Sequence, residues 1–204
     1  MKKLNFILII FILFQLNISF AQNGDIWNTY TSADGLVSNV ITTIMESSDG
    51  TLWIGTVGGI NLYSEGNMET ISTIEGAPDE WITSILESSK GALWFGTRYG
   101  GIFRYFQRKW THYTKENTND KLVSNTVYTI IESSDSTIWI GTDAGISRYY
   151  KEMWEIFNDD NGRLGNHVRV ILELSKGSFI FGSNAGTYKY DDEKWDRIGD
   201  ENFS

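Results

Sequence analysis

The sequence predicts an all-β protein built from the blades of a β-propeller, and three repeating features lead to that prediction. A glycine follows a strand-like run that contains aromatic residues four times, at spacings of 41, 45 and 41 residues. A glutamate and a bulky residue recur in the same phase. The markers are Gly55, Gly96, Gly141 and Gly182; Glu46, Glu87, Glu132 and Glu173; and Trp27, Met68, Trp110, Trp154 and Trp195. A period of about 40–45 residues is typical of propeller blades.

Each repeat divides into four short strands. In the first repeat, strand 41–47 leads into a turn at Asp49-Gly50, a pair typical of β-hairpins. Strand 51–56, a turn at 57–59, strand 60–63 and strand 68–73 follow. The other first strands begin at Ile82, Val127 and Val168, and the four fourth strands end near Thr73, Tyr113, Phe157 and Ile198. The repeats therefore predict four four-stranded antiparallel blades.

One further strand, 26–31, is a surplus N-terminal copy of a fourth strand without the rest of its blade. In a closed propeller such a strand completes the last blade, but here the last blade has its own fourth strand at 194–198. We therefore expect an incomplete propeller, the front portion of a longer one. The alternatives are four blades that close on themselves and two chains that complete a ring. Open blade faces would favour self-association.

The repeated residues have structural interpretations. Glycine weakens a strand unless another backbone comes close, so we expect the four glycines where neighbouring blades pack tightly. We expect Trp53, Trp94 and Trp139 to anchor blade packing. Strict repetition of the four glutamates favours a structural role over a ring of functional carboxylates.

Residues 1–21 predict a secretory signal peptide. Lys2 and Lys3 precede an apolar stretch, and Ser19 and Ala21 place small residues at the −3 and −1 positions of a cleavage site. Cleavage after Ala21 would leave residues 22–204 as a propeller domain in the periplasm or outside the cell. The alternative is an uncleaved membrane anchor. No other stretch is apolar enough to cross a bilayer.

Charge and composition narrow the classes of partner. The formal net charge is −9, and removing a signal peptide with two lysines and no acid takes it to −11. An acidic protein repels phosphate backbones, so nucleic acid is not an expected partner. The absence of cysteine excludes disulfides, thiolate metal sites and cysteine nucleophiles. No spacing of metal ligands is present, so we expect neither a metal nor a cofactor.

Two segments carry a resemblance to a known family. Residues 48–56 and 58–63 resemble the two-component regulator propeller repeat. Residues 34–39 are similar to the DGL-S-N segment of that family, with a degraded copy at 121–125 and a weaker one at 164–166. Such repeats usually form the periplasmic sensor part of hybrid two-component regulators and often recognise glycans. The resemblance implies a sensing role, whereas nothing after the repeats resembles a membrane span, a kinase, a receiver or a helix-turn-helix.

Propellers bind ligands in the funnel formed by one set of loops. We expect contacts from residues that differ between repeats in the loops that lead into each first strand or join second to third strands, or near the start of a first strand. Trp81, at such a loop, can stack on the apolar face of a sugar ring. The predicted ligand-binding residues are Trp81, Arg98, Tyr99, Tyr128, Asp143, His167, Arg169 and Asn184.

The sequence favours a binding protein over an enzyme, with no catalytic residue predicted. The two histidines, His112 and His167, lie at non-equivalent places, and no nucleophile elbow or phosphate loop is present. One reading is a sensor or binding module for a glycan or another small ligand. The other is a protein-interaction scaffold or a secreted propeller without signalling output. A propeller lyase or glycosidase is third, and would need two acids, or His167 and an acid, across the funnel.

Overall fold

The computed structural model describes residues 28–71, 76–157, 164 and 167–199. Residues 28–30 belong to one unit and the described residues from Thr31 onwards to another. The predicted signal peptide, 1–21, lies outside the described residues, as do most residues of the loop 159–167. In the described ranges no helix is long and apolar enough to cross a membrane.

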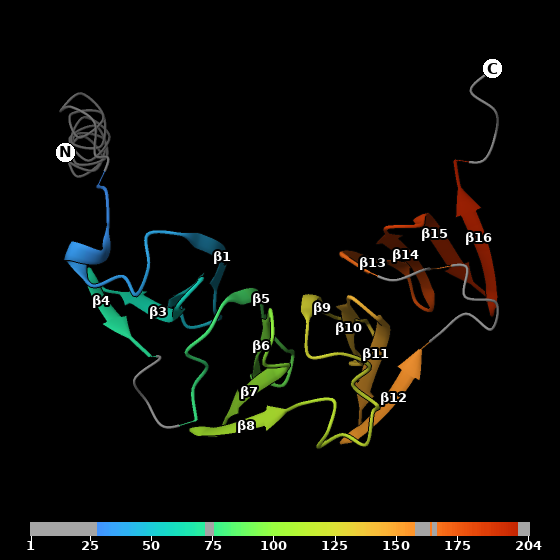
Figure 1. Ribbon diagram of the computed structural model, residues 1–204, viewed down its shortest axis with the longest axis horizontal. Helices are drawn as coiled ribbons and strands as arrows, with labels where there is room; N and C mark the ends of the chain where they lie inside the picture. The colour runs from blue at the N-terminus through green and yellow to red at the C-terminus, as the bar shows by residue number, and fades with distance from the viewer. Residues whose placement is uncertain (1–27, 72–75, 158–163, 165–166, 200–204) are drawn as a thin grey trace, which may run out of the picture. The chain divides into compact units, whose positions relative to one another are not determined.

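The unit from Thr31 onwards holds four antiparallel sheets, each of four strands in sequence order (Figure 1). Sheet 1 contains β1 (Ile41–Glu46), β2 (Leu52–Thr56), β3 (Gly59–Ser64) and β4 (Asn67–Thr70). Sheet 2 contains β5 (Ile82–Glu87), β6 (Leu93–Thr97), β7 (Ile102–Phe106) and β8 (Lys109–Tyr113). Sheet 3 contains β9 (Val127–Glu132), β10 (Ile138–Thr142), β11 (Gly145–Tyr150) and β12 (Met153–Phe157). Sheet 4 contains β13 (Val170–Ser175), β14 (Ser178–Ser183), β15 (Gly186–Asp191) and β16 (Lys194–Ile198).

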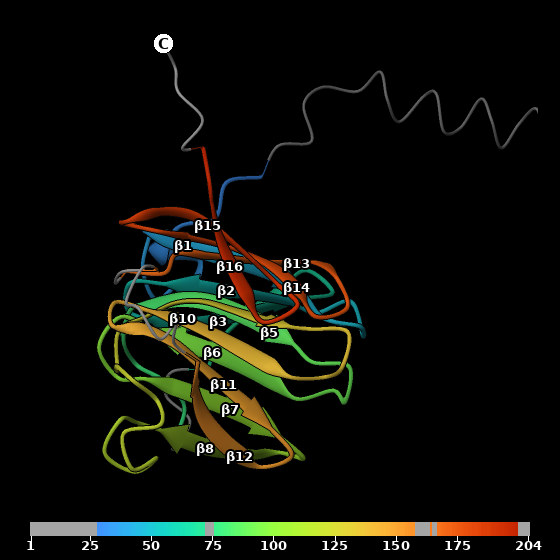
Figure 2. The same cartoon turned by 90° about the vertical axis from the view of Figure 1, so that its right-hand side faces the viewer.

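The predicted blades are therefore confirmed. In each blade, consecutive strands are neighbours because tight hairpin turns connect them. Third and fourth strands join through two residues with φ between 47° and 85°. The pairs are Glu65–Gly66, Gln107–Arg108, Lys151–Glu152 and Asp192–Glu193. Two left-handed residues match the twist of the flanking strands. In Figure 2 the orders β6, β7, β8 and β10, β11, β12 run the same way through their sheets.

Neighbouring sheets pack through their first two strands: β1 and β2 against β5, β5 and β6 against β9, and β9 and β10 against β13. Apolar core clusters fill the spaces between them. Trp53, Trp94 and Trp139 are 7%, 2% and 4% exposed, which confirms that they anchor blade packing. Each belongs to a cluster that also holds residues of the next sheet.

The repeated glycines lie where the next sheet approaches, as predicted, in three of four sheets. A Cβ on Gly55 would lie 2.8 Å from Ile82 of sheet 2, and one on Gly96 would lie 2.6 Å from Val127 of sheet 3. A Cβ on Gly141 would lie 2.5 Å from the carbonyl oxygen of Val168, just before β13. Gly182 of sheet 4 differs, because only Val170 of its own sheet comes within 4 Å.

The repeated glutamates join neighbouring sheets. The carboxylate of Glu87 accepts hydrogen bonds from the backbone N–H (2.6 Å) and hydroxyl (2.8 Å) of Ser48 in sheet 1. Glu132 accepts the same pair from Ser89 at 2.5 and 2.7 Å. The third pair joins Glu173 to Ser134 at 2.7 and 2.8 Å. The structural role predicted for the glutamates is confirmed at these three positions, and we call this contact the Glu–Ser clasp.

The segment similar to DGL-S-N contacts the third strand of the sheet that follows it in sheets 1 and 3. The amide of Asn61, fully buried in β3, accepts from the N–H of Val37 at 2.8 Å and donates to the carbonyl of Gly35 at 2.9 Å. In sheet 3, the hydroxyl of Ser147 accepts from the N–H of Val123 at 3.0 Å. The leucines of the three copies, Leu36, Leu122 and Leu164, are 7%, 0% and 3% exposed.

Three expectations need correction. Residues 28–31, the described part of the surplus strand 26–31, form no strand; Thr31 caps a short 3₁₀ helix, η1 (Ser32–Asp34). A fourth strand needs a third strand as its partner, and sheet 1 already has β4 beside β3. The last first strand begins at Val170 rather than Val168, because the N–H of Val168 bonds to sheet 3. The sheets do not close into a ring, so four blades closed on themselves is wrong for this structure.

Candidate functional site

The two sets of loops that sequence reasoning selected lie together at one end of the sheets. This end, where each first strand begins and each second strand ends, is called the mouth end below. The loops are joined by backbone hydrogen bonds from Arg98 N–H to the carbonyl of Trp81 (2.9 Å) and from Asp143 N–H to that of Thr126 (3.2 Å). Sheet 1 has the same bond from Val57 to Val40 at 3.2 Å.

Three predicted residues form a first cluster at the mouth of sheet 2. The guanidinium carbon of Arg98 lies 4.5 Å from the centre of the Trp81 ring, within range of a cation–π contact. Arg98 Nε donates to the Tyr99 hydroxyl at 2.9 Å. Tyr99 is 67% exposed. The cluster therefore presents one aromatic ring and one cation to solvent.

Sequence reasoning missed the support of this cluster. Glu80 is half-buried, and its carboxylate lies against the turn at Gly100, whose N–H donates to the Thr97 hydroxyl at 2.9 Å. Burial raises the pKa of the Glu80 carboxyl above its ordinary value, although the backbone N–H groups of Tyr99 and Gly100 act to lower it. His112 Nε2 lies 2.6 Å from the carbonyl oxygen of Gly100. A signal was available, because Glu80 stands where the three other repeats have the motif asparagine, Asn39, Asn125 and Asn166.

Three more predicted residues form a second cluster, between sheets 3 and 4. The Tyr128 hydroxyl lies 2.9 Å from His167 Nδ1, and the two rings stack at 5.9 Å. The Arg169 guanidinium lies 4.7 Å from the centre of the Tyr128 ring. The N–H of His167 donates to the carbonyl of Asp143 at 3.1 Å. His167 has a φ of 59°, so its backbone is left-handed, which turns the chain toward sheet 3.

The two clusters thus contain six of the eight predicted residues. Asp143 contacts the second cluster through its backbone carbonyl, which accepts from the N–H of His167. Asn184 is exposed on the matching turn of sheet 4. The two arginines of the clusters, Arg98 and Arg169, form no ion pair among the residues that the structure describes. Although the chain is acidic, this end offers two cations held against aromatic rings.

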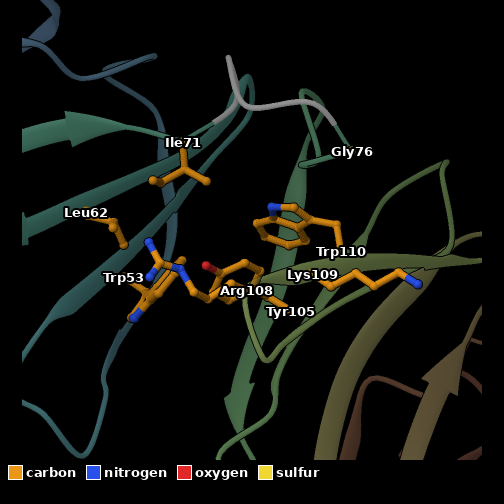
Figure 3. Close-up of a pocket in the computed structure, with 8 residues that line it drawn as sticks. All are labelled: Trp53, Leu62, Ile71, Gly76, Tyr105, Arg108, Lys109 and Trp110. Carbon is orange, nitrogen blue, oxygen red and sulfur yellow. The ribbon is translucent and has the colours of Figure 1, made fainter.

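A pocket of about 520 Å³ opens elsewhere, between sheets 1 and 2 near their outer strands (Figure 3). Trp53, Tyr105 and Trp110 supply aromatic walls, and Figure 3 shows Arg108 extending into the pocket while Lys109 points away. The remaining lining residues are Leu62, Ile71 and Gly76. Sequence reasoning did not consider this place, because it lies outside the funnel loops.

The pocket has a local cause. On β7 and β11, arginines pair across from the tryptophans of β6 and β10, and Arg104 and Arg148 lie 5.2 and 5.8 Å from those rings. On β3 the residue across from Trp53 is Leu62, a shorter side chain that leaves space beside the buried ring. The corresponding cavities at Arg104 and Arg148 are about 60 and 280 Å³.

The charge around this pocket differs from the charge at the interface between sheets 2 and 3. Between sheets 2 and 3, Arg104 forms an ion pair at 3.3 Å with Glu152, the second residue of a hairpin turn. At the matching turn of sheet 2 stands Arg108, which is exposed and has no ion pair in the described ranges. An aromatic slot with an unpaired guanidinium suits a ligand that has both an apolar face and a carboxylate.

Few side chains that could act together in catalysis lie close to one another among the described residues. His167 Nδ1 is occupied by the hydroxyl of Tyr128, and no His–acid ion pair is found in the part of the chain that the structure describes. The described residues also hold no group of three or more His, Asp or Glu side chains placed to bind a metal ion.

Comparison with known proteins finds a family match in three segments of the chain. The family model described as two component regulator propeller matches residues 35–58, 76–99 and 121–144. A comparison with curated proteins found no match.

Solved structures share the fold. An extracellular domain assigned to a hybrid two component system of B. thetaiotaomicron aligns with a TM-score of 0.75 and 17% identity, over 85% of this chain and 26% of that one. A streptogramin B lyase aligns at 0.61 and 18% identity, over 79% and 55%. An ancestral GH74 enzyme aligns at 0.61 and 12% identity, over 80% and 26%. The chain spans about a quarter of the length of the extracellular domain that it matches, and propellers similar to it include enzymes.

Proposed function

Because three segments of this chain are two-component regulator propeller repeats, we propose that it is an exported ligand-binding module, the N-terminal part of a two-component sensor that recognises a glycan or another small ligand. The module would act in the periplasm or outside the cell after cleavage following Ala21. It would bind its ligand without turning it over.

The pocket between sheets 1 and 2 is the observation that carries this proposal. Its volume of about 520 Å³ lies in the range of small-ligand sites, about 300–1,000 Å³. Trp110 and Tyr105, both half-buried, offer ring faces for stacking on a sugar, and the Arg108 guanidinium offers donors to a carboxylate. The ligand class that fits best is therefore a small acidic sugar.

The mouth end is the second place where such a ligand could bind. Arg98 and Arg169 are unpaired with acids in the described ranges and lie against aromatic rings. However, Arg98 already lies over the ring of Trp81 and would have to move for a sugar to stack there. This cost favours the pocket, which the half-buried ring of Trp110 lines.

The test uses residues 22–204 and isothermal titration with a galacturonic acid trimer, with maltotriose as the neutral probe. Leu62→Arg places in β3 the residue type that β7 and β11 already carry, so it should fill the pocket without unfolding the sheet. We expect it to abolish binding of the acidic trimer. Arg108→Asn, which suits a left-handed φ, should remove the preference for the acidic over the neutral probe.

The mouth end is tested in parallel with the double variant Trp81→Ala and Arg98→Ala. If that variant loses the trimer while Leu62→Arg keeps it, the ligand binds at the mouth end instead. If the unmodified protein binds neither sugar, the proposal of a glycan-binding module is wrong. Reducing-sugar analysis after prolonged incubation checks for turnover, and release of new chain ends would contradict a purely binding role.

A further inference from the structure

The turn between the first and second strands contains an acidic acceptor in sheets 1 and 3. In sheet 1, the carboxylate of Asp49 accepts from the N–H of Thr51 at 3.0 Å and from the hydroxyl of Ser47 at 2.7 Å. The same serine oxygen accepts from the indole N–H of Trp53 at 3.2 Å. Sheet 3 repeats these three contacts at 3.0, 2.7 and 3.0 Å with Asp135, Thr137, Ser133 and Trp139. A carboxylate therefore fixes the turn and, through the serine, the tryptophan.

Sheet 2 lacks this acceptor, because Lys90 stands where sheets 1 and 3 have the aspartate. The oxygen of Ser88 here accepts from the N–H of Ala92 at 3.1 Å, a bond that the aspartate takes in the other two sheets. The indole N–H of Trp94 has no hydrogen-bond partner among the described residues, although the side chain is only 2% exposed. A buried donor without an acceptor is costly, so this N–H is expected to bind a group from outside the chain.

A second unpaired donor lies beside the first. Arg104 pairs across from Trp94, and its side chain is 16% exposed. Its Nη1 bonds to Tyr149 and Glu152, but its buried Nε has no partner in the described ranges. Arg104, Trp94 and Ser88 all line the cavity of about 60 Å³ between sheets 2 and 3. One water needs about 10–15 Å³ of such space, so the cavity has room for a small polyatomic ion.

The charges around this cavity favour an anion. Lys90 and Lys151 line it and form no ion pair among the residues that the structure describes. Its two carboxylates already have partners, since Glu132 accepts from sheet 2 in the Glu–Ser clasp and Glu152 pairs with Arg104. The matching cavity between sheets 3 and 4 has acids at both lysine positions, Asp135 and Asp192.

We propose that the cavity between sheets 2 and 3 binds a small oxyanion, which supplies the negative charge that the aspartate supplies in sheets 1 and 3. Its oxygens would accept from the indole N–H of Trp94 and from Nε of Arg104, while Lys90 and Lys151 balance its charge at the rim. The groups without partners are all donors, so an anion satisfies them better than water, whose own hydrogens need acceptors.

The bound ion would connect sheet 2 to the hairpin turn of sheet 3 that carries Lys151. The cavity is too small for a sugar, so this site is separate from the larger pocket between sheets 1 and 2 and does not depend on the proposed glycan binding. An inorganic oxyanion and the carboxylate of a small acid share the required chemistry, and the experiment distinguishes them.

The test titrates residues 22–204 with sodium sulfate and, separately, with sodium acetate by calorimetry at constant ionic strength. The tighter of the two identifies an inorganic or a carboxylate site. Lys90→Asp introduces the residue type that sheets 1 and 3 carry at this position. It should weaken anion binding at least about tenfold, because it reverses one charge and supplies a carboxylate from within the chain. The same variant should raise the unfolding midpoint in buffer without sulfate or acetate.

Lys176→Asp is the matched control. It makes the same charge change at the same position of sheet 4, where Ile180 stands in place of the tryptophan and offers no N–H. Anion binding should be unchanged in this variant. General effects of sulfate on protein stability should also persist in it, so they are separated from binding at the site.

The indole N–H signals in a ¹⁵N–¹H spectrum locate the anion. The signal of Trp94, identified by its absence from Trp94→Phe, should move as the anion is added to the unmodified protein and should stay in place in Lys90→Asp. Heat of binding to neither anion, equal weakening by Lys176→Asp, or a Trp94 signal that does not respond to the anion would overturn the proposal.

Discussion

Gly141→Ala tests whether close approach of the next sheet is the reason for the repeated glycines. The new methyl group would lie 2.5 Å from the carbonyl oxygen of Val168 and 2.8 Å from Cγ2 of Thr129, against ordinary contacts of 3.4 Å or more. The backbone cannot easily retreat, because Val168 N–H bonds to Thr142 at 2.8 Å and His167 N–H to Asp143 at 3.1 Å. Overpacking of this kind costs about 1–3 kcal/mol.

Gly182→Ala is the matched control. Its methyl group would meet only Val170, at an ordinary 3.4 Å. Replacing glycine without strain stabilises a protein by about 0.4–1 kcal/mol through the unfolded state. Subtracting that gain leaves Gly141→Ala destabilised by about 1–2 kcal/mol net, so the two variants should differ by roughly 2 kcal/mol or about 4–8 °C in Tm.

Both variants are compared by thermal and urea unfolding at the same protein concentration. Equal unfolding midpoints for the two variants would refute the packing argument, since the new methyl group is crowded at Gly141 and has only ordinary contacts at Gly182. A loss of stability confined to Gly182→Ala would refute it more strongly.

Three further predictions follow from single contacts. Glu132→Gln should cost about 0.5–1.5 kcal/mol in urea unfolding, since an amide cannot accept both hydrogen bonds from Ser89; no change would rule out a stabilising clasp. Asn61→Ala should cost about 1–3 kcal/mol, because it orphans backbone groups of residues 35–37, whereas Asn61→Ser, the residue type of sheet 3, should cost less. For Glu80, a raised pKa in the folded state means that stability falls as pH rises above 4.5; Glu80→Gln should remove this slope in urea midpoints, and an unchanged slope would contradict the assignment.

Much of the fold followed from repetition. The interval between glycines located all sixteen strands to within a few residues, because a blade is a local unit whose hairpins are encoded by adjacent residues. Sequence variation between repeats in the loops also predicted the residues of two side-chain clusters. Residues that do not pack between blades can differ from repeat to repeat, and many of them lie at the mouth end. Glu80 was missed because the replacement of a motif asparagine by an acid looks like ordinary variation in the sequence. Only the structure shows that its carboxylate lies against the turn at Tyr99 and Gly100.

The pocket could not be foreseen from any one repeat. It depends on Leu62 in sheet 1 and Arg108 in sheet 2 facing one another, and these residues are 46 positions apart. A short side chain opposite a tryptophan makes a cavity only if no other sheet fills the space. The volume is therefore a property of the packed interface between two blades.

The sequence by itself determined the blade, its hairpins and the glycine and glutamate that recur in each repeat, because these depend on contacts within a blade or on a rule that every blade obeys. Only the tertiary structure decided which copies of those residues lie in a packed interface between sheets. Gly141 and Gly182 stand at the same point of the repeat, but one is covered by the next sheet and the other is open. Burial is set by neighbours, and neighbours are fixed by how the sheets pack rather than by any single repeat.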